Sequence, residues 1–327
     1  MIPNRPFVSV IVPVYNRKRL LEELLASFGE LTYPRDRFEV IVVDNFSSDG
    51  TWETLENAAE RAPYTLKVFR NPSAIRSASS SRNYGIRQSV GAILAFTDSD
   101  CLVTPEWLGA GVAKFQEGVG IVQGRTVPHS GEAIPILHHT VSVKTEKSYG
   151  ETCNIFYRRD LVEKVGGFDV DLGRVGNAAV WGEDTDLAYK IKALGATLAP
   201  ANDALIIHHI VPTRFRAWIF EPFRIWLWPK VVKRHPLIRH ELLFGRYFFT
   251  PMTALFDLLM FGVLLGAFWH WWFFALGLPF VISKYREGGK HLHVVLRLVR
   301  VVGGSLRAFV LFCTLLGGSV RFRSLVI

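Results

Sequence analysis

Short apolar runs alternate with helical patterns over the first 123 residues of the chain. Runs rich in Val and Ile predict strands at residues 7–12, 38–43, 66–69, 92–97 and 120–123. Apolar residues at helical spacing predict helices between them, at residues 17–28, 50–60, 80–89 and 106–115. This alternation is typical of βαβ units. We therefore expect an α/β fold with a Rossmann-like, mostly parallel sheet flanked by helices.

The pattern is less regular between residues 128 and 201. It predicts a helix at residues 159–165, a turn at Gly166-Gly167 and a clearer helix at residues 184–194. Asp184 and Asp186 lie near the start of the last helix, where the helix dipole favours negative charge. Helix capping alone can explain one of these two acids.

After residue 211 the pattern changes to arginines and lysines interleaved with aromatic residues, a mixture suited to a membrane interface. Residues 242–283 then form a long apolar stretch, and a helix needs roughly 20 apolar residues to cross a bilayer. This stretch predicts two short spans with a turn near residues 266–271, or a re-entrant hairpin. The last apolar run, residues 308–316, is short for a span. We expect three parts: a domain at 1–211, an interfacial segment at 212–241, and a membrane hairpin with an interfacial helix at 242–327.

The charge is as uneven as the hydropathy. Residues 1–211 hold 22 Lys and Arg against 25 Asp and Glu, whereas residues 212–327 hold 16 against 4. Because the basic half is also the apolar half, its positive charge indicates anionic lipid headgroups as partners and not nucleic acid.

The cysteines, the first apolar run and the basic residues around the long apolar stretch indicate the compartment and orientation of the chain. Cys101, Cys153 and Cys313 have no metal-ligand or redox spacing, which indicates a reducing compartment. The apolar run at residues 7–12 is too short for a signal peptide. Basic residues flank both ends of the apolar stretch, so the positive-inside rule places both ends, and the first domain, on the cytoplasmic side.

Polar residues follow three of the predicted strands directly. In parallel α/β sheets, ligands bind at the carboxyl ends of the strands. The three clusters are Pro13-Val14-Tyr15-Asn16, Asp44-Asn45 and Asp98-Ser99-Asp100. Any one of them is explained equally well as a turn, but three at strand ends favour a binding site. The carboxylates of Asp98 and Asp100 suit Mg²⁺ or Mn²⁺, which bind through carboxylates together with substrate phosphates. Asp-x-Asp alone is a weak motif.

A second acidic cluster, Trp181-Gly182-Glu183-Asp184, combines carboxylates with an aromatic ring and a flexible glycine. One carboxylate can accept a proton from a hydroxyl group while the ring packs on a substrate. Ordinary helix capping is an equal alternative.

Basic side chains supply further candidates. Arg82, close to a predicted helix start, can grip a diphosphate, although a solvated surface arginine is the simpler alternative. His208 and His209 follow the apolar run at residues 204–207 and can add metal ligands. A structural histidine pair explains them equally well.

Together these sequence segments resemble those of the glycosyltransferases of family two, which have the GT-A fold. The resemblance covers residues 7–211 and rests on seven segments in order, at residues 8–16, 40–45, 81–86, 96–100, 154–159, 165–169 and 182–187. It implies inverting transfer of a sugar from a nucleotide-diphosphate donor. The implied nucleoside pocket comprises Pro13, Tyr15, Asn16 and Asp44. The other implied roles are diphosphate contact for Arg82, ribose and metal binding for Asp98 and Asp100, base catalysis for Asp184 beside Glu183, and acceptor binding for Trp181 and Gly182.

Departures from family patterns narrow the expected function. Processive polysaccharide synthases of this family carry Gln-x-x-Arg-Trp, which Arg214-Phe215-Arg216-Ala217-Trp218 does not match. We therefore expect non-processive transfer to a lipid-linked or glycan acceptor at the cytoplasmic membrane face. Processive synthesis and an inactive membrane scaffold remain the alternatives. A nucleotide-dependent oxidoreductase is disfavoured because no Gly-x-Gly-x-x-Gly follows the first predicted strand.

Overall fold

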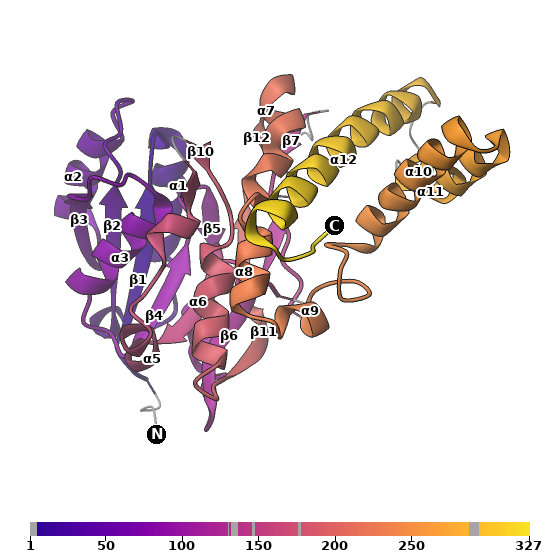
Figure 1. Cartoon of the computed structure of the whole chain (residues 1–327). Coiled ribbons are helices and arrows are strands. Elements are labelled where there is room, and N and C mark those ends of the chain that lie inside the picture. Colours follow the sequence, from indigo (N-terminus) through magenta and orange to yellow (C-terminus); the bar gives the residue numbers. More distant parts are fainter. Residues whose placement is uncertain (1–4, 130, 132–136, 146–147, 176–177, 288–293) are drawn as a thin grey trace. The chain divides into compact units, whose positions relative to one another are not determined.

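The computed structural model describes residues 5–129, 131, 137–145, 148–175, 178–287 and 294–327 (Figure 1). The chain forms two compact units. The first comprises Met1–Ala179 with Glu183–Pro212, and the second comprises Val180–Gly182 with Thr213–Ile327. The short segment Val180–Gly182 thus belongs to the second unit, although the chain on both sides of it belongs to the first.

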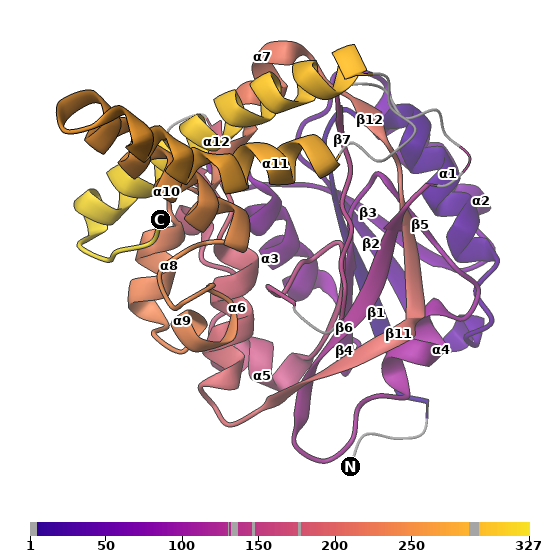
Figure 2. The ribbon, with the colours of Figure 1, turned by 90° about the vertical axis from the view of Figure 1, so that its right-hand side faces the viewer.

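An eight-stranded sheet in the order β3-β2-β1-β4-β8-β6-β11-β5 forms the centre of the first unit. Strands β3, β2, β1 and β4 are parallel, β8 runs antiparallel to β4 and β6, and β5 runs antiparallel to β11. Figure 2 shows β6, β11 and β5 side by side. The strands are β1 (Val8–Val14), β2 (Phe38–Asp44), β3 (Thr65–Arg70), β4 (Ile93–Thr97), β5 (Cys101–Val103), β6 (Val119–Pro128), β8 (Asn154–Arg158) and β11 (Thr197–His208).

Helices cover both faces of this sheet, and each face has its own apolar core. One core joins the sheet to α1 (Lys18–Gly29), α2 (Thr51–Arg61) and α4 (Trp107–Val112). The other joins it to α3 (Ala78–Gln88), α5 (Arg159–Lys164) and α6 (Glu183–Lys192). Short strand pairs add β7 (His138–His139) with β12 (Val211–Pro212), and β9 (Arg174–Val175) with β10 (Ala178–Ala179). The predicted α/β fold with a mixed, mostly parallel sheet is confirmed.

Helix α3 lies unusually close to β1. A Cβ atom on Gly85 would come within 2.6 Å of the Ile11 side chain, so only glycine allows this approach. The helix begins with a capping box in which Ser77 and Ser80 each accept a hydrogen bond from the other residue's backbone N–H. Close packing and a defined start together fix the position of α3 against the sheet.

The predicted strands and helices of the first 123 residues all form, within about three residues of their expected ends except for β6, which continues to Pro128. The pattern did not reveal β5, β8 and β11. Strand β11 contains Pro200 and an irregularity between Ala201 and Leu205, which interrupt the alternation that marks a strand. Strand β5 is only three residues long, and β8 lies in the region after residue 128 where the pattern is irregular.

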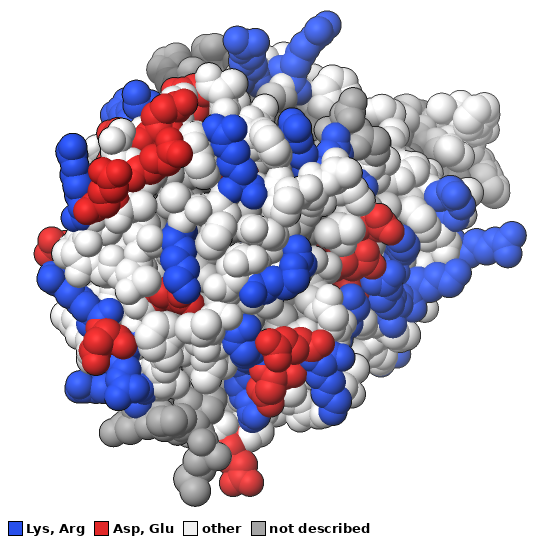
Figure 3. Space-filling model, turned by 90° about the vertical axis from the view of Figure 1, so that its left-hand side faces the viewer, with Lys and Arg blue, Asp and Glu red and all other residues white. Residues whose placement is uncertain are grey.

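Side-chain charge on the face shown in Figure 3 is mixed, with Lys and Arg interspersed with Asp and Glu. This agrees with the near balance of charges in residues 1–211.

The second unit is helical. It contains α7 (Phe215–Phe220), η3 (Glu221–Ile225), α8 (Trp228–Arg234), α9 (Ile238–Glu241), α10 (Pro251–Phe268), η4 (Trp271–Gly277), α11 (Leu278–Glu287) and α12 (Val294–Phe322). Helix α10 and η4 form a hairpin in which Gly262 and Gly266 approach η4 closely. Trp269, Trp271 and Trp272 at its turn are exposed. The turn at Trp269-His270 falls within the predicted region.

Two helices of the described chain are long and apolar enough to cross a membrane, Pro251–Phe268 and Val301–Phe322. The second corrects the expectation that the last apolar run is too short, because α12 continues well beyond residues 308–316 at both ends. Arg307 does not end the apolar helix, since its guanidinium pairs with Glu221 at 2.7 Å and lies 4.7 Å from the centre of the Trp218 ring.

Candidate active site

The ends of β1 and β2 bring four predicted residues together. Strand β1 pairs with β2 in register, Pro13 opposite Val43 and Val14 opposite Asp44. The Asp44 carboxylate is fully buried and accepts a hydrogen bond from the Ser47 backbone N–H at 3.1 Å. Ser47 Oγ in turn accepts from the Asn16 N–H at 2.8 Å. Tyr15 next to this network is 57% exposed, so it is free to contact a ligand.

Arg82 lies at the centre of a cluster of three carboxylates, one from the end of β4 and two from the start of α6. It projects from α3 and is buried, and its guanidinium is 2.8 Å from Asp98, 3.4 Å from Asp184 and 3.7 Å from Glu183. Three carboxylates around one guanidinium leave an excess of negative charge. The structure thus joins Asp98, at the end of β4, to the two acids at the start of α6, although their positions in the sequence are far apart.

Asp184 is held from two sides. Thr152 donates two hydrogen bonds to Asp184 Oδ2, from its backbone N–H at 3.1 Å and from Oγ1 at 2.7 Å. Asp184 Oδ1 faces Arg82. Partial burial raises the pKa of Asp184, an effect that outweighs the opposing influence of Arg82 and Thr152. A fixed carboxylate with a raised pKa is suited to accept a proton.

A further acid, Glu151, lies beside this cluster and was not expected from the sequence. It accepts hydrogen bonds from Ser148 Oγ at 2.9 Å and from the Tyr149 N–H at 3.0 Å. Burial raises its pKa. Neither Thr152 nor Glu151 belongs to a motif that assigns it a role, so only the contacts with Asp184 and its surroundings identify them.

If Asp184 is the base that the sequence predicts, Thr152→Val should reduce the turnover number about tenfold, because a hydrogen bond to a charged group contributes about 1.5–3 kcal/mol and part of this would position the carboxylate. The donor KM should stay unchanged. Steady-state kinetics with a saturating acceptor measure the effect. Thr104→Val is the matched control, since the Thr104 hydroxyl also donates one hydrogen bond, to the Leu205 carbonyl. Equal losses in both variants would contradict a positioning role.

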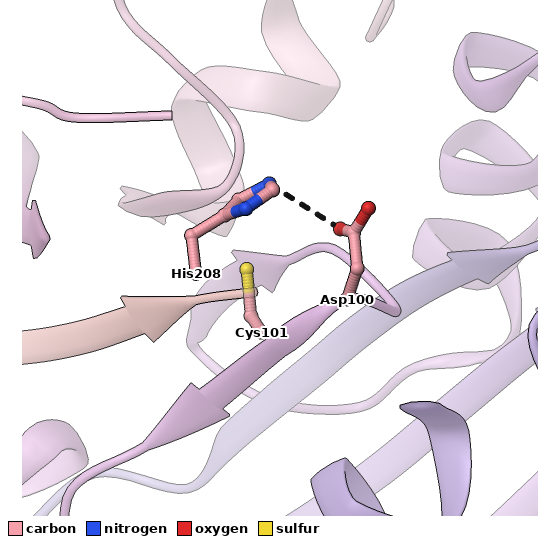
Figure 4. Close-up of side chains that lie close together, drawn as sticks. All are labelled: Asp100, Cys101 and His208. Carbon is pink, nitrogen blue, oxygen red and sulfur yellow. Dashed lines mark ion pairs between the residues drawn. The ribbon is translucent and has the colours of Figure 1, made fainter. Parts of the chain in front are cut away.

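A second group gathers around Asp100. His208 Nε2 lies 3.4 Å from Asp100 Oδ1 (Figure 4). Arg17 Nη2 lies 3.7 Å from Asp100 Oδ2. His208 Nδ1 is 2.7 Å from the His209 carbonyl oxygen, which can only accept, so Nδ1 carries the proton. The other ring nitrogen, Nε2, faces Asp100 and is the atom available to a cation. An imidazole nitrogen and a carboxylate at this spacing suit a divalent cation.

The predicted metal ligands therefore divide. Asp100 and His208 come together with Cys101. Among the described residues, these three form the group of His, Cys, Asp or Glu side chains whose ligand atoms all lie within 4.8 Å of one another. Asp98 and His209 are outside this group. Arg82 holds the Asp98 carboxylate instead. The ring of His209 stacks on His129, and its Nε2 lies 3.5 Å from Glu23, because successive residues of an extended chain point in opposite directions.

Trp181 and Gly182 belong to the second unit. The Trp181 N–H donates to the Arg224 carbonyl at 2.6 Å, and the Arg224 guanidinium lies 4.3 Å from the centre of the Trp181 ring. Gly182 has a φ of +143°, and a Cβ there would also meet Val231 at 3.0 Å. The acceptor residues expected from the sequence are thus held by contacts with the C-terminal helices, while the next residue begins α6.

Comparison with known proteins gives one consistent result. The family model described as "Glycosyl transferase family 2" matches residues 9–170. Glycosyltransferase AglE of Haloferax volcanii is 33% identical over 234 residues, which cover 69% of this chain and 73% of that protein. The succinoglycan biosynthesis protein ExoM of Rhizobium meliloti is 30% identical over 223 residues, 64% of this chain and 69% of that protein.

Solved structures agree on the fold. A mannosyltransferase from Pyrobaculum calidifontis, in complex with GDP-Man and Mn²⁺, superposes with a TM-score of 0.59 at 21% identity, covering 98% of this chain and 87% of that one. TarS from S. aureus (residues 1–349), in complex with UDP-GlcNAc, gives a TM-score of 0.52 at 18% identity and covers 97% and 92%.

Proposed function

The chain belongs to glycosyltransferase family two, and from this premise we propose that it is an inverting, non-processive transferase acting on a lipid-linked or glycan acceptor. Its donors are nucleotide sugars. The observation that carries the proposal is the cluster of Asp98, Arg82 and Asp184, which joins a donor-side carboxylate to a candidate base.

In the proposed reaction, Asp184 accepts the proton of an acceptor hydroxyl as the hydroxyl oxygen attacks the anomeric carbon. The bond between that carbon and the diphosphate breaks on the opposite side, and the nucleoside diphosphate leaves with the bonding electrons. Thr152 and Arg82 keep the Asp184 carboxylate in place. Attack opposite the leaving group inverts the anomeric carbon in one step.

We assign Pro13, Tyr15, Asn16 and Asp44 to the nucleoside, and Asp98 to the ribose side of the donor. Asp100 and His208 fit a divalent cation, Mg²⁺ or Mn²⁺, because an imidazole nitrogen and a carboxylate oxygen face each other at 3.4 Å. When bound, such an ion offsets the negative charge that builds on a departing diphosphate.

A screen of UDP-, GDP- and TDP-linked sugars tests the function, with nucleoside diphosphate release by the purified chain in detergent as the readout. We expect release with one donor class, and loss of release when divalent ions are chelated. Release that survives chelation would remove the cation from the proposal. Folded protein without activity on any donor would favour the inactive scaffold, and long products would favour processive synthesis.

Trp181 is proposed to contact the acceptor, because its ring is exposed and the residue precedes Glu183 by two positions in the chain. Trp181→Ala should raise the acceptor KM about tenfold, since an aromatic contact contributes about 0.5–1.5 kcal/mol beyond burial. Trp181→Phe should keep most of the affinity, and hydrolysis of the donor by water should not change in either variant. A parallel loss of donor hydrolysis would show damage to α6 instead of to acceptor binding.

The second unit is proposed to attach the enzyme to the cytoplasmic face of a membrane, in contact with anionic lipids. Its exposed tryptophans and basic segments support this assignment. Replacing Trp269, Trp271 and Trp272 by alanine should reduce co-flotation with anionic vesicles at least about tenfold, because each ring contributes about 1 kcal/mol or more of apolar burial. Val90→Ala with Leu194→Ala removes exposed apolar surface from the first unit and should change nothing. Equal flotation of all variants would contradict this assignment.

A further inference from the structure

Sheet register places a cysteine against the candidate cation site. Strands β5 and β11 are antiparallel, and Cys101 is directly opposite His208. Residues paired in this way carry their side chains on the same face of the sheet, with Cβ atoms about 4.5–5.5 Å apart. Asp100 immediately precedes Cys101. One ligand atom from each of the three residues therefore lies within 4.8 Å of the others, and Figure 4 shows the three side chains converging.

These three donors differ in chemical softness. A carboxylate oxygen suits Mg²⁺ and Mn²⁺, whereas a thiolate beside an imidazole suits Zn²⁺, Cd²⁺ and Co²⁺. A buried cysteine is often only a small apolar side chain, and Cys101 does contribute to a hydrophobic core. Its pairing with His208 goes beyond that role, because packing alone does not require an imidazole nitrogen and a carboxylate oxygen within 4.8 Å of the sulfur.

We infer that Cys101 is a third protein ligand. The site then binds thiophilic divalent ions through sulfur, with higher affinity than Mg²⁺ or Mn²⁺. The metal–sulfur bond forms as the thiol releases its proton to solvent, and no redox change takes place. Because the three side chains already converge, binding needs no rearrangement of the sheet. The inference rests on the proposed cation role of Asp100 and His208.

Cobalt is the most direct probe, because a Co²⁺–thiolate bond produces a sulfur-to-metal charge-transfer band in the near ultraviolet. Co²⁺ added to the metal-free full chain in detergent should produce this band. Cys101→Ser should abolish it. Cys153→Ser is the matched control: Cys153 is also buried but lies outside the three-residue group, and this variant should keep the band.

Affinity measured by competition with a chromophoric chelator gives a second readout. Cys101→Ser should weaken Cd²⁺ binding at least about tenfold, because loss of a residue that only supports a metal ligand already weakens metal binding by about that factor. Mn²⁺ binding should change little. Cys101→Ala repeats the comparison if the serine variant is unstable. Co²⁺ bound without a sulfur band, or a band that persists in Cys101→Ser, would overturn the inference.

The two proposals fail separately. Normal sugar transfer without a sulfur band would remove only Cys101 from the site. Absence of transfer with every donor would refute the proposed function, and the cobalt spectrum would still decide whether sulfur binds the metal.

Discussion

Asp184→Asn should reduce the turnover number about 1,000-fold, because general acid–base catalysis typically contributes 10²- to 10⁴-fold. Asparagine keeps an oxygen that can accept from Thr152, so the local structure should persist. Nucleoside diphosphate release with saturating acceptor measures the loss. The dissociation constant for the nucleoside diphosphate should stay within about threefold of the wild-type value, because Asp184 is assigned to the acceptor side.

A pH profile adds a test of the same residue. The pKa of Asp184 is raised by partial burial, and the proposed base acts only when deprotonated. Wild-type activity should therefore fall as the pH drops through a value above the ordinary range of aspartate. Asp160→Asn changes an exposed acid paired with Arg158 and should leave rate and profile unchanged. A folded Asp184→Asn variant with the wild-type rate would remove Asp184 from the role of base.

Arg82→Gln should lower the free energy of unfolding by about 2 kcal/mol at neutral pH and also strongly impair transfer. Breaking a fully buried ion pair costs about 3–5 kcal/mol. The expected value is smaller because Asp98 and Asp184 keep 31% and 28% of their side-chain surface exposed, which screens the uncompensated charge. Denaturant unfolding followed by fluorescence measures the difference.

The destabilisation by Arg82→Gln should shrink as the pH falls. Arg82 opposes the raised pKa of Asp184, so without the guanidinium that pKa rises further in the folded state and folding favours the protonated form. The variant therefore regains stability relative to the wild type at low pH and loses it as the pH rises. Arg159→Gln is the matched control, since Arg159 donates largely to neutral groups such as the Gly91 carbonyl and Ser89 Oγ. A gap independent of pH would contradict the electrostatic role of Arg82.

The sequence was sufficient to predict the parallel half of the sheet and the residues at its carboxyl ends. Apolar runs of β1, β2 and β4 are short, continuous and followed by polar residues, so the positions of Asp44 and Asp98 could be inferred. Family resemblance then connected them with Asp184. These inferences need only local pattern and the rule that ligands bind where parallel strands end.

The remainder depends on pairing between distant strands, which local pattern does not encode. The place of Cys101 beside His208 follows from the antiparallel register of β5 and β11, and an irregular stretch in β11 hides that strand. The choice of His208 over His209 follows from the direction in which each ring leaves the chain. Thr152 and Glu151 lie in a loop whose position is set by tertiary contacts.

The assignment of Val180–Gly182 to the C-terminal unit has a practical consequence for dissecting this enzyme. A fragment ending near Pro212 would retain these three residues but lose the Arg224 carbonyl, the Arg224 guanidinium and Val231, which hold them. The chain would then be unanchored immediately before Glu183 and Asp184. Removing the C-terminal unit to obtain a catalytic fragment would thus also remove the contacts of the segment that leads into α6.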